Sequence, residues 1–213
     1  MDTKKKNWLV TAVLFCVFVA YTAVVKFVDV GFGLEGTELG LSTINHACEK
    51  MFPFKSFWYD LTEYLGYAAL GVCLAFALLG LVQLIKGRSL KKVDKEIWIL
   101  AGFYVVVIAF YVLFEKLIIN YRPVILDEGL EASYPSSHTV LAACVYISAF
   151  FMFMKYVKNK TLLACLQGLC VLAAVLTIVG RLFSGVHWVS DIVGGLLLSA
   201  ALIHGFLVAI KAK

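Results

Sequence analysis

Residues 171–200, VLAAVLTIVGRLFSGVHWVSDIVGGLLLSA, decide the fold, because two apolar runs enclose one short polar stretch. The centre of this segment, residues 180–191, carries Arg181, His187 and Asp191 among mostly apolar neighbours. Charged groups are costly next to a membrane interior and need a function or a partner there. Each flanking run approaches the ~20 residues of a spanning helix. The segment therefore predicts two membrane spans joined by a polar turn.

The polar residues of this turn predict a nucleophile and an anion-binding group. A helix that is regular from His187 onward would place Asp191, four residues later, on the same face. The carboxylate would orient one imidazole nitrogen and leave the other free as a nucleophile or base. Arg181 offers a fork of donors that suits phosphate or carboxylate. The alternative is structural: Arg181 and Asp191 form a buried ion pair around the turn, and His187 caps a helix.

The composition excludes an ordinary soluble protein. Of the 213 residues, 62% are hydrophobic and 15% are charged, as is typical of polytopic membrane proteins. We expect a single membrane domain over residues 1–213 with an all-α fold, a bundle of six transmembrane helices. The expected spans are 8–28, 64–85, 97–119, 139–157, 161–180 and 188–210. The first span lacks a cleavage pattern, so we expect it to be retained rather than removed as a signal peptide.

The basic residues predict the orientation of these helices. Of the 19 lysines and arginines, 13 fall near the two termini and in the connections after the second and fourth spans. This side is expected to be cytoplasmic, so both termini are cytoplasmic and the polar clusters open to the extracytoplasmic face of the plasma membrane. The net charge of +5 is spread over short loops, which argues against nucleic acid as a partner.

The longest expected loop covers residues 29–63. Glycines predict turns at its start, and the aromatic residues within 51–59 are typical of a segment in the headgroup region. We favour an interfacial anchor over the alternatives of a lid or a path for a lipid tail. His46 has no partner at metal-binding spacing and is expected to be a surface histidine, while the six cysteines are expected to be small apolar fillers.

A second polar cluster ends the third span. Lys116 lies near the helix end and Arg122 follows it, so that two cations near one helix terminus can bind an anion. Alternatively, Lys116 extends to the interface and Arg122 pairs with a nearby acidic residue. The candidate partners are Asp127, Glu128 and Glu131.

A third cluster, PSSH at residues 135–138, comes directly before the fourth span. A serine here can cap the helix, and the exposed N–H groups of a helix start can bind phosphate oxygens. The hydroxyl groups of Ser136 and Ser137 can add to this site. His138 would then lie within reach of a bound phosphate.

Together, the three clusters fit phosphoryl transfer without a metal or another cofactor. The cations would neutralise the phosphate oxygens, as magnesium often does elsewhere. His187, oriented by Asp191, would attack phosphorus and form a phosphohistidine. His138 would donate a proton to the departing lipid oxygen and then activate the water that releases phosphate.

The spacing of these residues resembles the three-part signature of the type 2 phosphatidic acid phosphatase superfamily: Lys-x6-Arg-Pro, Pro-Ser-Gly-His and Ser-Arg-x5-His-x3-Asp. Residues 116–191 contain counterparts of all three parts. The resemblance implies a six-helix bundle with its site near the outer membrane surface. It also implies that His187 is the nucleophile, Asp191 its orienter and His138 the acid and base. The implied phosphate ligands are Lys116, Arg122, Ser136, Ser137 and Arg181.

Three positions depart from the signature. Ser137 replaces its glycine, and Gly180 replaces the serine before the arginine. The first part is one residue short, so Glu115 holds the usual lysine position and Lys116 follows it. On a regular helix this shift turns the lysine by about 100°.

We therefore expect an integral membrane lipid phosphatase that acts on a phosphomonoester or pyrophosphate in the outer leaflet. Its candidate substrates are undecaprenyl pyrophosphate, phosphatidylglycerol phosphate and phosphatidic acid, and the small chain and outward site favour the first by analogy. One alternative is a metal-dependent hydrolase built on His138, His187 and Asp191, which the flanking cations disfavour. The other is a catalytically silent protein that binds or transports lipid phosphates.

Overall fold

The computed structural model describes residues 3–126 and 129–211. Within these ranges the chain forms α-helices, two short 3₁₀ helices (η1 and η2) and one small antiparallel β-hairpin. The elements in chain order are α1 (Thr3–Phe27), β1 (Gly31–Phe32), η1 (Leu34–Gly36), β2 (Glu38–Leu39), α2 (Ser42–Met51), α3 (Ser56–Gly87), η2 (Leu90–Lys92), α4 (Lys95–Lys116), α5 (Ser137–Tyr156), α6 (Lys160–Phe183) and α7 (Val189–Lys211).

Among the described helices, six are long and apolar enough to cross a membrane, namely α1, α3, α4, α5, α6 and α7. This confirms the predicted all-α bundle of six transmembrane helices. The outward faces of these helices are apolar: Leu74 of α3 is 59% exposed and Val105 of α4 is 65% exposed. Helices suit this environment because they satisfy their backbone hydrogen bonds internally.

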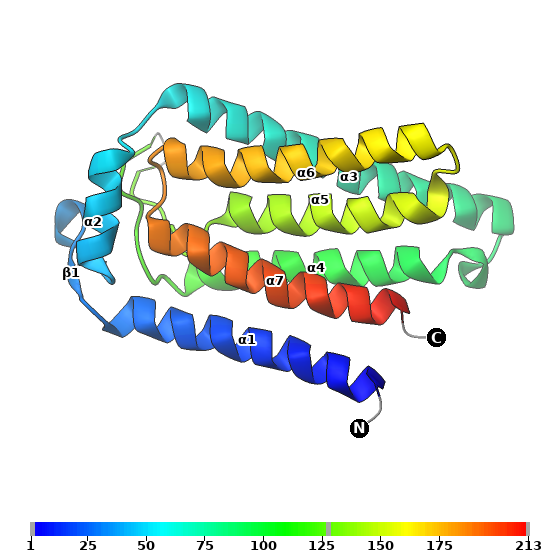
Figure 1. Ribbon diagram of the computed structural model, residues 1–213, viewed down its shortest axis with the longest axis horizontal. Coiled ribbons are helices and arrows are strands. Elements are labelled where there is room, and N and C mark those ends of the chain that lie inside the picture. Colours follow the sequence, from blue (N-terminus) through cyan, green and yellow to red (C-terminus); the bar gives the residue numbers. More distant parts are fainter. Residues whose placement is uncertain (1–2, 127–128, 212–213) are drawn as a thin grey trace.

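α5 is the central helix of the bundle. It contacts α3, α4, α6 and α7, whereas α1 packs on α7 at the edge of the bundle (Figure 1). Its inner positions include the buried small residues Ala142, Ala143 and Ala149. Small side chains allow neighbouring helices to approach closely inside a membrane. The start of α5 is therefore held between several other helices.

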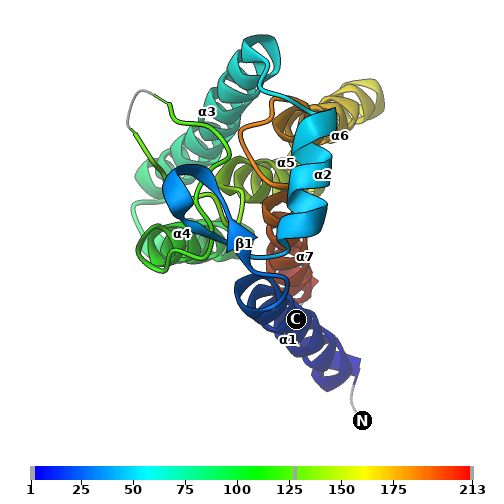
Figure 2. The same cartoon turned by 90° about the vertical axis from the view of Figure 1, so that its left-hand side faces the viewer.

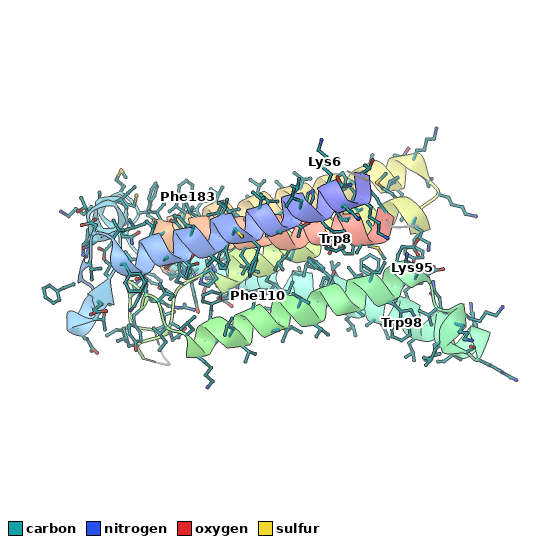
Figure 3. All side chains as sticks on the ribbon, turned by 90° about the horizontal axis from the view of Figure 1, so that it is seen from below. Lys6, Trp8, Lys95, Trp98, Phe110 and Phe183 are labelled. Atoms are coloured by element: carbon teal, nitrogen blue, oxygen red, sulfur yellow. The ribbon has the colours of Figure 1, made fainter. Side chains whose placement is uncertain are left out.

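Both chain termini lie at one end of the bundle, together with the α3–α4 and α5–α6 connections (Figure 1). Figure 3 shows the labelled Lys6, Trp8, Lys95 and Trp98 toward this end and Phe183 toward the other. Tryptophan favours the membrane–water interface. The arrangement therefore brings the basic connections together at one end, as the predicted orientation requires.

The opposite end is covered by the segment between α1 and α3 (Figure 2). α2 crosses the ends of the spanning helices there. Asn45 of α2 is fully buried, and its amide donates to the Gly40 carbonyl at 2.8 Å and to Ser190 Oγ at 2.9 Å. Because Ser190 belongs to the first turn of α7, this part of the expected loop packs onto the bundle end.

α3 begins at Ser56, whereas hydropathy places the span start at residue 64. Asp60 and Glu63 interrupt the apolar sequence and hide the first turns of this helix. The turns are held by packing: the Trp58 ring lies 5.4 Å from the Phe183 ring, between centroids, and the Lys55 N–H donates to the Ser184 carbonyl at 3.0 Å. The start of α3 is thus fixed against the end of α6.

Candidate functional site

The third cluster, residues 135–138, and the polar turn within residues 180–191 meet at the covered end of the bundle. The Ser136 N–H donates to the Asp191 carbonyl oxygen at 3.1 Å, which fixes the start of α5 against the start of α7. Ser136 is fully buried, and its hydroxyl oxygen accepts from the Thr139 N–H at 3.4 Å, so it caps α5 as expected.

His187 lies just before α7, which begins at Val189. The condition of a regular helix from His187 onward is therefore not met. A local turn replaces it: Trp188 N–H donates to Asp191 Oδ2 at 3.0 Å, and Asp191 N–H donates to the Trp188 carbonyl at 3.0 Å. This turn still brings His187 Nδ1 to 3.6 Å from Asp191 Oδ2.

The environment of His187 favours the neutral imidazole. The residue is 5% exposed and lies outside the spanning helices. Its burial lowers its pKa well below the ordinary value, and the positive charges of Arg122, Arg181 and His138 lower that pKa further. A neutral imidazole has a free lone pair, so His187 meets the first requirement of a nitrogen nucleophile.

Arg181 and His138 share a partner that the sequence did not single out, Glu63 of α3. Glu63 Oε1 lies 2.6 Å from Arg181 Nη2, and Glu63 Oε2 lies 3.4 Å from His138 Nε2. The Arg181 side chain is 0% exposed and also faces the Tyr59 ring, 5.3 Å from its centroid. The alternative of an Arg181–Asp191 ion pair is therefore wrong. An ionisable residue beside a membrane span was the available signal for Glu63.

Arg122 lies in the segment between α4 and α5 and pairs with Glu131. Its Nη2 is 2.9 Å from Glu131 Oε2, and its N–H donates to the Glu131 carbonyl at 3.0 Å. This is one of the alternatives stated for Arg122. The other two candidate partners, Asp127 and Glu128, lie outside the described residues.

Lys116 is the last residue of α4, and its side chain is exposed. The neighbouring Glu115, which holds the signature's usual lysine position, lines the cavity beside His138. The one-residue shift in the sequence therefore exchanges a cation for a carboxylate at the wall of the site.

Several buried nitrogen atoms of the described site residues have no hydrogen-bond partner. They are Arg122 Nε, Arg181 Nε and Nη1, His138 Nδ1, and both ring nitrogens of His187. Buried donors are normally satisfied. Guanidinium groups with free N–H bonds, next to imidazole rings, therefore indicate an anion-binding site. Among the residues that the structure describes, no group of three or more His, Cys, Asp or Glu is placed to bind a metal ion.

A cavity of about 420 Å³ lies beside this cluster, bounded by α3, α4 and α5. Polar residues gather where it meets the site, including Glu63, Ser137, His138 and His187. Most of the remaining wall is apolar and includes Gly66, Leu70, Val107, Ile108, Phe110, Phe114, Val140, Leu141 and Leu198. The cavity thus joins an anion site to a space suited to a hydrocarbon chain.

Gly180 departs from the signature for a structural reason. A Cβ atom at this position would lie 2.6 Å from Thr62 Cγ2 and 3.4 Å from Trp58 Cε3. The first turns of α3 therefore occupy the space that the serine side chain of the signature would need. Glycine lets α3 approach α6 closely enough for Glu63 to contact Arg181.

A protein-family model described as the PAP2 superfamily matches residues 97–213, more than half of the chain. The chain belongs to the PAP2 superfamily. This confirms the resemblance to type 2 phosphatidic acid phosphatases. The match covers α4 to α7 with their connections, and so includes His138, Arg181, His187 and Asp191, but it leaves out Glu63 on α3.

A relative in sequence and a crystal structure, both from Bacillus subtilis, are similar to this PAP2 protein. Phosphatidylglycerophosphatase B of strain 168 is 32% identical over 94 residues, which cover 41% of this chain and 44% of that relative. The matching region thus spans less than half of the relative's length. The crystal structure of a transmembrane PAP2 type phosphatidylglycerolphosphate phosphatase superimposes with a TM-score of 0.63 at 18% identity, covering 93% of each chain. The second likeness supports the fold.

We expect Gly180→Ser, which restores the residue of the signature, to destabilise the protein. The added side chain meets Thr62 Cγ2, so overpacking should lower the free energy of unfolding by about 1–3 kcal/mol. Thr62→Ser removes this methyl group and should rescue stability in the double variant. Thermal unfolding of the four proteins in detergent forms a double-mutant cycle. Additive effects would contradict a direct clash between the two positions.

We expect His187→Gln to change how stability depends on pH. The pKa of His187 is lower in the folded protein, so below about pH 6.5 the unfolded chain takes up a proton that folded His187 does not. Between the ordinary pKa and the lower folded-state pKa, the free energy of unfolding of the wild type should therefore fall by up to about 1.4 kcal/mol for each pH unit. Above the ordinary pKa, it should not change for this reason. Melting temperatures in detergent from about pH 8 to about pH 5 measure this difference. A constant gap between the two proteins would contradict the lowered pKa.

Proposed function

We propose that this PAP2 protein is a membrane lipid phosphatase. One observation carries the proposal: buried Arg122 and Arg181 N–H groups without partners lie near His138 and His187, and these two histidines line an apolar cavity. The guanidinium groups suit a phosphate, and the cavity suits the attached hydrocarbon chain. Family membership supports the same function.

The proposed reaction uses the two histidines in succession. His187, neutral and oriented by Asp191, attacks phosphorus; a nitrogen–phosphorus bond forms while the bond to the lipid oxygen breaks. His138, in its protonated form, gives its proton to that oxygen and then accepts one from the water that releases phosphate. Arg122 and Arg181 balance the charge of the transferred group, with Ser136 and Ser137 at the start of α5.

For the substrate, we propose a lipid phosphomonoester, with phosphatidylglycerol phosphate as the first candidate. The relative in sequence and the similar crystal structure, both from Bacillus subtilis, carry the name of that activity. Undecaprenyl pyrophosphate, favoured by the size of the chain and its outward site, and phosphatidic acid are the other candidates. All three are lipids that combine a phosphate or pyrophosphate group with long hydrocarbon chains, so their common chemistry fits the cavity.

We also propose that the site faces the extracytoplasmic side. The basic residues at the ends of the chain and in the α3–α4 and α5–α6 connections support this orientation, because positively charged loops remain in the cytoplasm. The site lies at the end of the bundle opposite to these connections. It would therefore act on lipids of the outer leaflet.

We expect the purified protein to release phosphate from at least one of the three lipids with excess chelator present. His187→Ala should lower this rate more than about a thousandfold, because it removes the attacking nitrogen. Phosphate release from each lipid in detergent micelles is the measurement, with the melting temperature of the variant as the control for folding. Loss of activity with chelator would favour the metal-dependent alternative. Folded wild-type protein without any release would favour a binding or transport protein.

We expect Lys116 to matter far less than Arg122. Lys116→Ala should change kcat/KM less than about threefold because the Lys116 side chain is exposed. Arg122→Ala should lower kcat/KM about a hundredfold because it removes a hydrogen-bond donor to the phosphate. Both rates are measured on the preferred lipid. A large loss in Lys116→Ala would show that this lysine turns back into the site.

A further inference from the structure

Glu63 places a negative charge inside the proposed phosphate site. Its two carboxylate oxygens bridge Arg181 Nη2 at 2.6 Å and His138 Nε2 at 3.4 Å. Its side chain is 26% exposed and lines the cavity, so the carboxylate is accessible from the space that the lipid would enter. The residue comes from α3, outside the three-part signature and outside the matching family region.

The carboxylate and a phosphate held by two hydrogen bonds share one nitrogen of Arg181. Its two hydrogens belong to different edges of the guanidinium, so the two anions compete through their charges. Nη2 takes part in both edges through which a guanidinium grips an anion with two hydrogen bonds. Nε and Nη1 of Arg181 are buried and have no partner among the described residues, so they are available to a second anion. A phosphate that binds there meets the Glu63 carboxylate at Nη2, and two like charges at one guanidinium repel each other.

We infer that Glu63 is an internal competitor for phosphate: its carboxylate leaves Arg181 Nη2 when the phosphoryl group binds and returns when inorganic phosphate departs. The inference rests on the proposed function and adds a specificity-determining residue to that site. Glu63 weakens the binding of phosphate anions in general, and its return speeds product release. It also keeps its second oxygen 3.4 Å from Nε2 of His138, the imidazole that acts as acid and base in the proposed reaction.

Glu63→Gln tests this role because it removes the charge and keeps the shape of the side chain. We expect the inhibition constants of inorganic phosphate and orthovanadate to fall about tenfold, since one charged contact no longer competes. KM for the lipid should fall as well, and kcat should fall because the product leaves more slowly. Asp60→Asn is the matched control: it removes the same charge from an exposed position one turn earlier on α3 and should leave the inhibition constants unchanged.

A purely structural role for Glu63 predicts the opposite change in the inhibition constants. If the carboxylate only holds Arg181 in place, Glu63→Gln should raise the inhibition constants; a rise, or no change, would overturn the inference. Should this variant fail to fold, Glu63→Asp keeps the charge on a shorter side chain that cannot bridge both partners. The same constants are then expected to fall by a smaller factor, and unchanged constants would again overturn the inference.

The failure of this inference can be told apart from the failure of the proposed function. Calorimetric titration measures the affinity of the folded wild type and of Glu63→Gln for inorganic phosphate. This comparison tests competition at Arg181 without any turnover. Hydrolysis by the wild type together with equal phosphate affinity in the two proteins would reject only the role of Glu63. Absence of hydrolysis together with tighter phosphate binding in Glu63→Gln would reject the phosphatase and retain the competitor.

Discussion

The buried guanidinium of Arg181 constrains the architecture around it. A charge that is fully removed from solvent costs several kcal/mol unless it is paired, and the partner here is Glu63. This pair joins the end of α6 to the second turn of α3, where Tyr59 adds its ring face to the guanidinium. The α3 helix must therefore begin early and approach α6 closely, and Gly180 provides the space.

A second constraint holds the second and third parts of the signature together. The Asp191 carbonyl accepts a hydrogen bond from the Ser136 N–H, and the Asp191 carboxylate accepts one from the Trp188 N–H. One residue therefore fixes the start of α5, the turn before α7 and the neighbouring imidazole of His187. Asn45 of α2 completes this region through Ser190. The covering segment thus supports the turn that carries the proposed nucleophile.

The bundle separates polar and apolar functions along its length. Buried arginines and histidines lie at the covered end, and an apolar cavity begins beside them between α3, α4 and α5. A lipid phosphate has the same division between headgroup and chain. In the proposed function, this match selects the substrate class, while the balance between Arg181 and Glu63 sets how firmly the phosphate is held.

Apolar runs and the spacing of His138, Arg181, His187 and Asp191 were sufficient to predict the six spans and the superfamily. Hydropathy and motif spacing are local properties, so the sequence alone determined them. It did not reveal that α3 begins at Ser56, because Asp60 and Glu63 lower the hydropathy of the first turns of this helix.

Tertiary structure decided the partners of the site residues. The pairing of Glu63 with Arg181 spans 118 positions of the chain, and no local pattern encodes such a contact. The turn that brings His187 to Asp191 without a shared helix likewise depends on hydrogen bonds formed when α7 packs against the start of α5. The residue types determine which chemistry the site can perform. The balance of charge between the site residues arises only where helices distant in sequence meet.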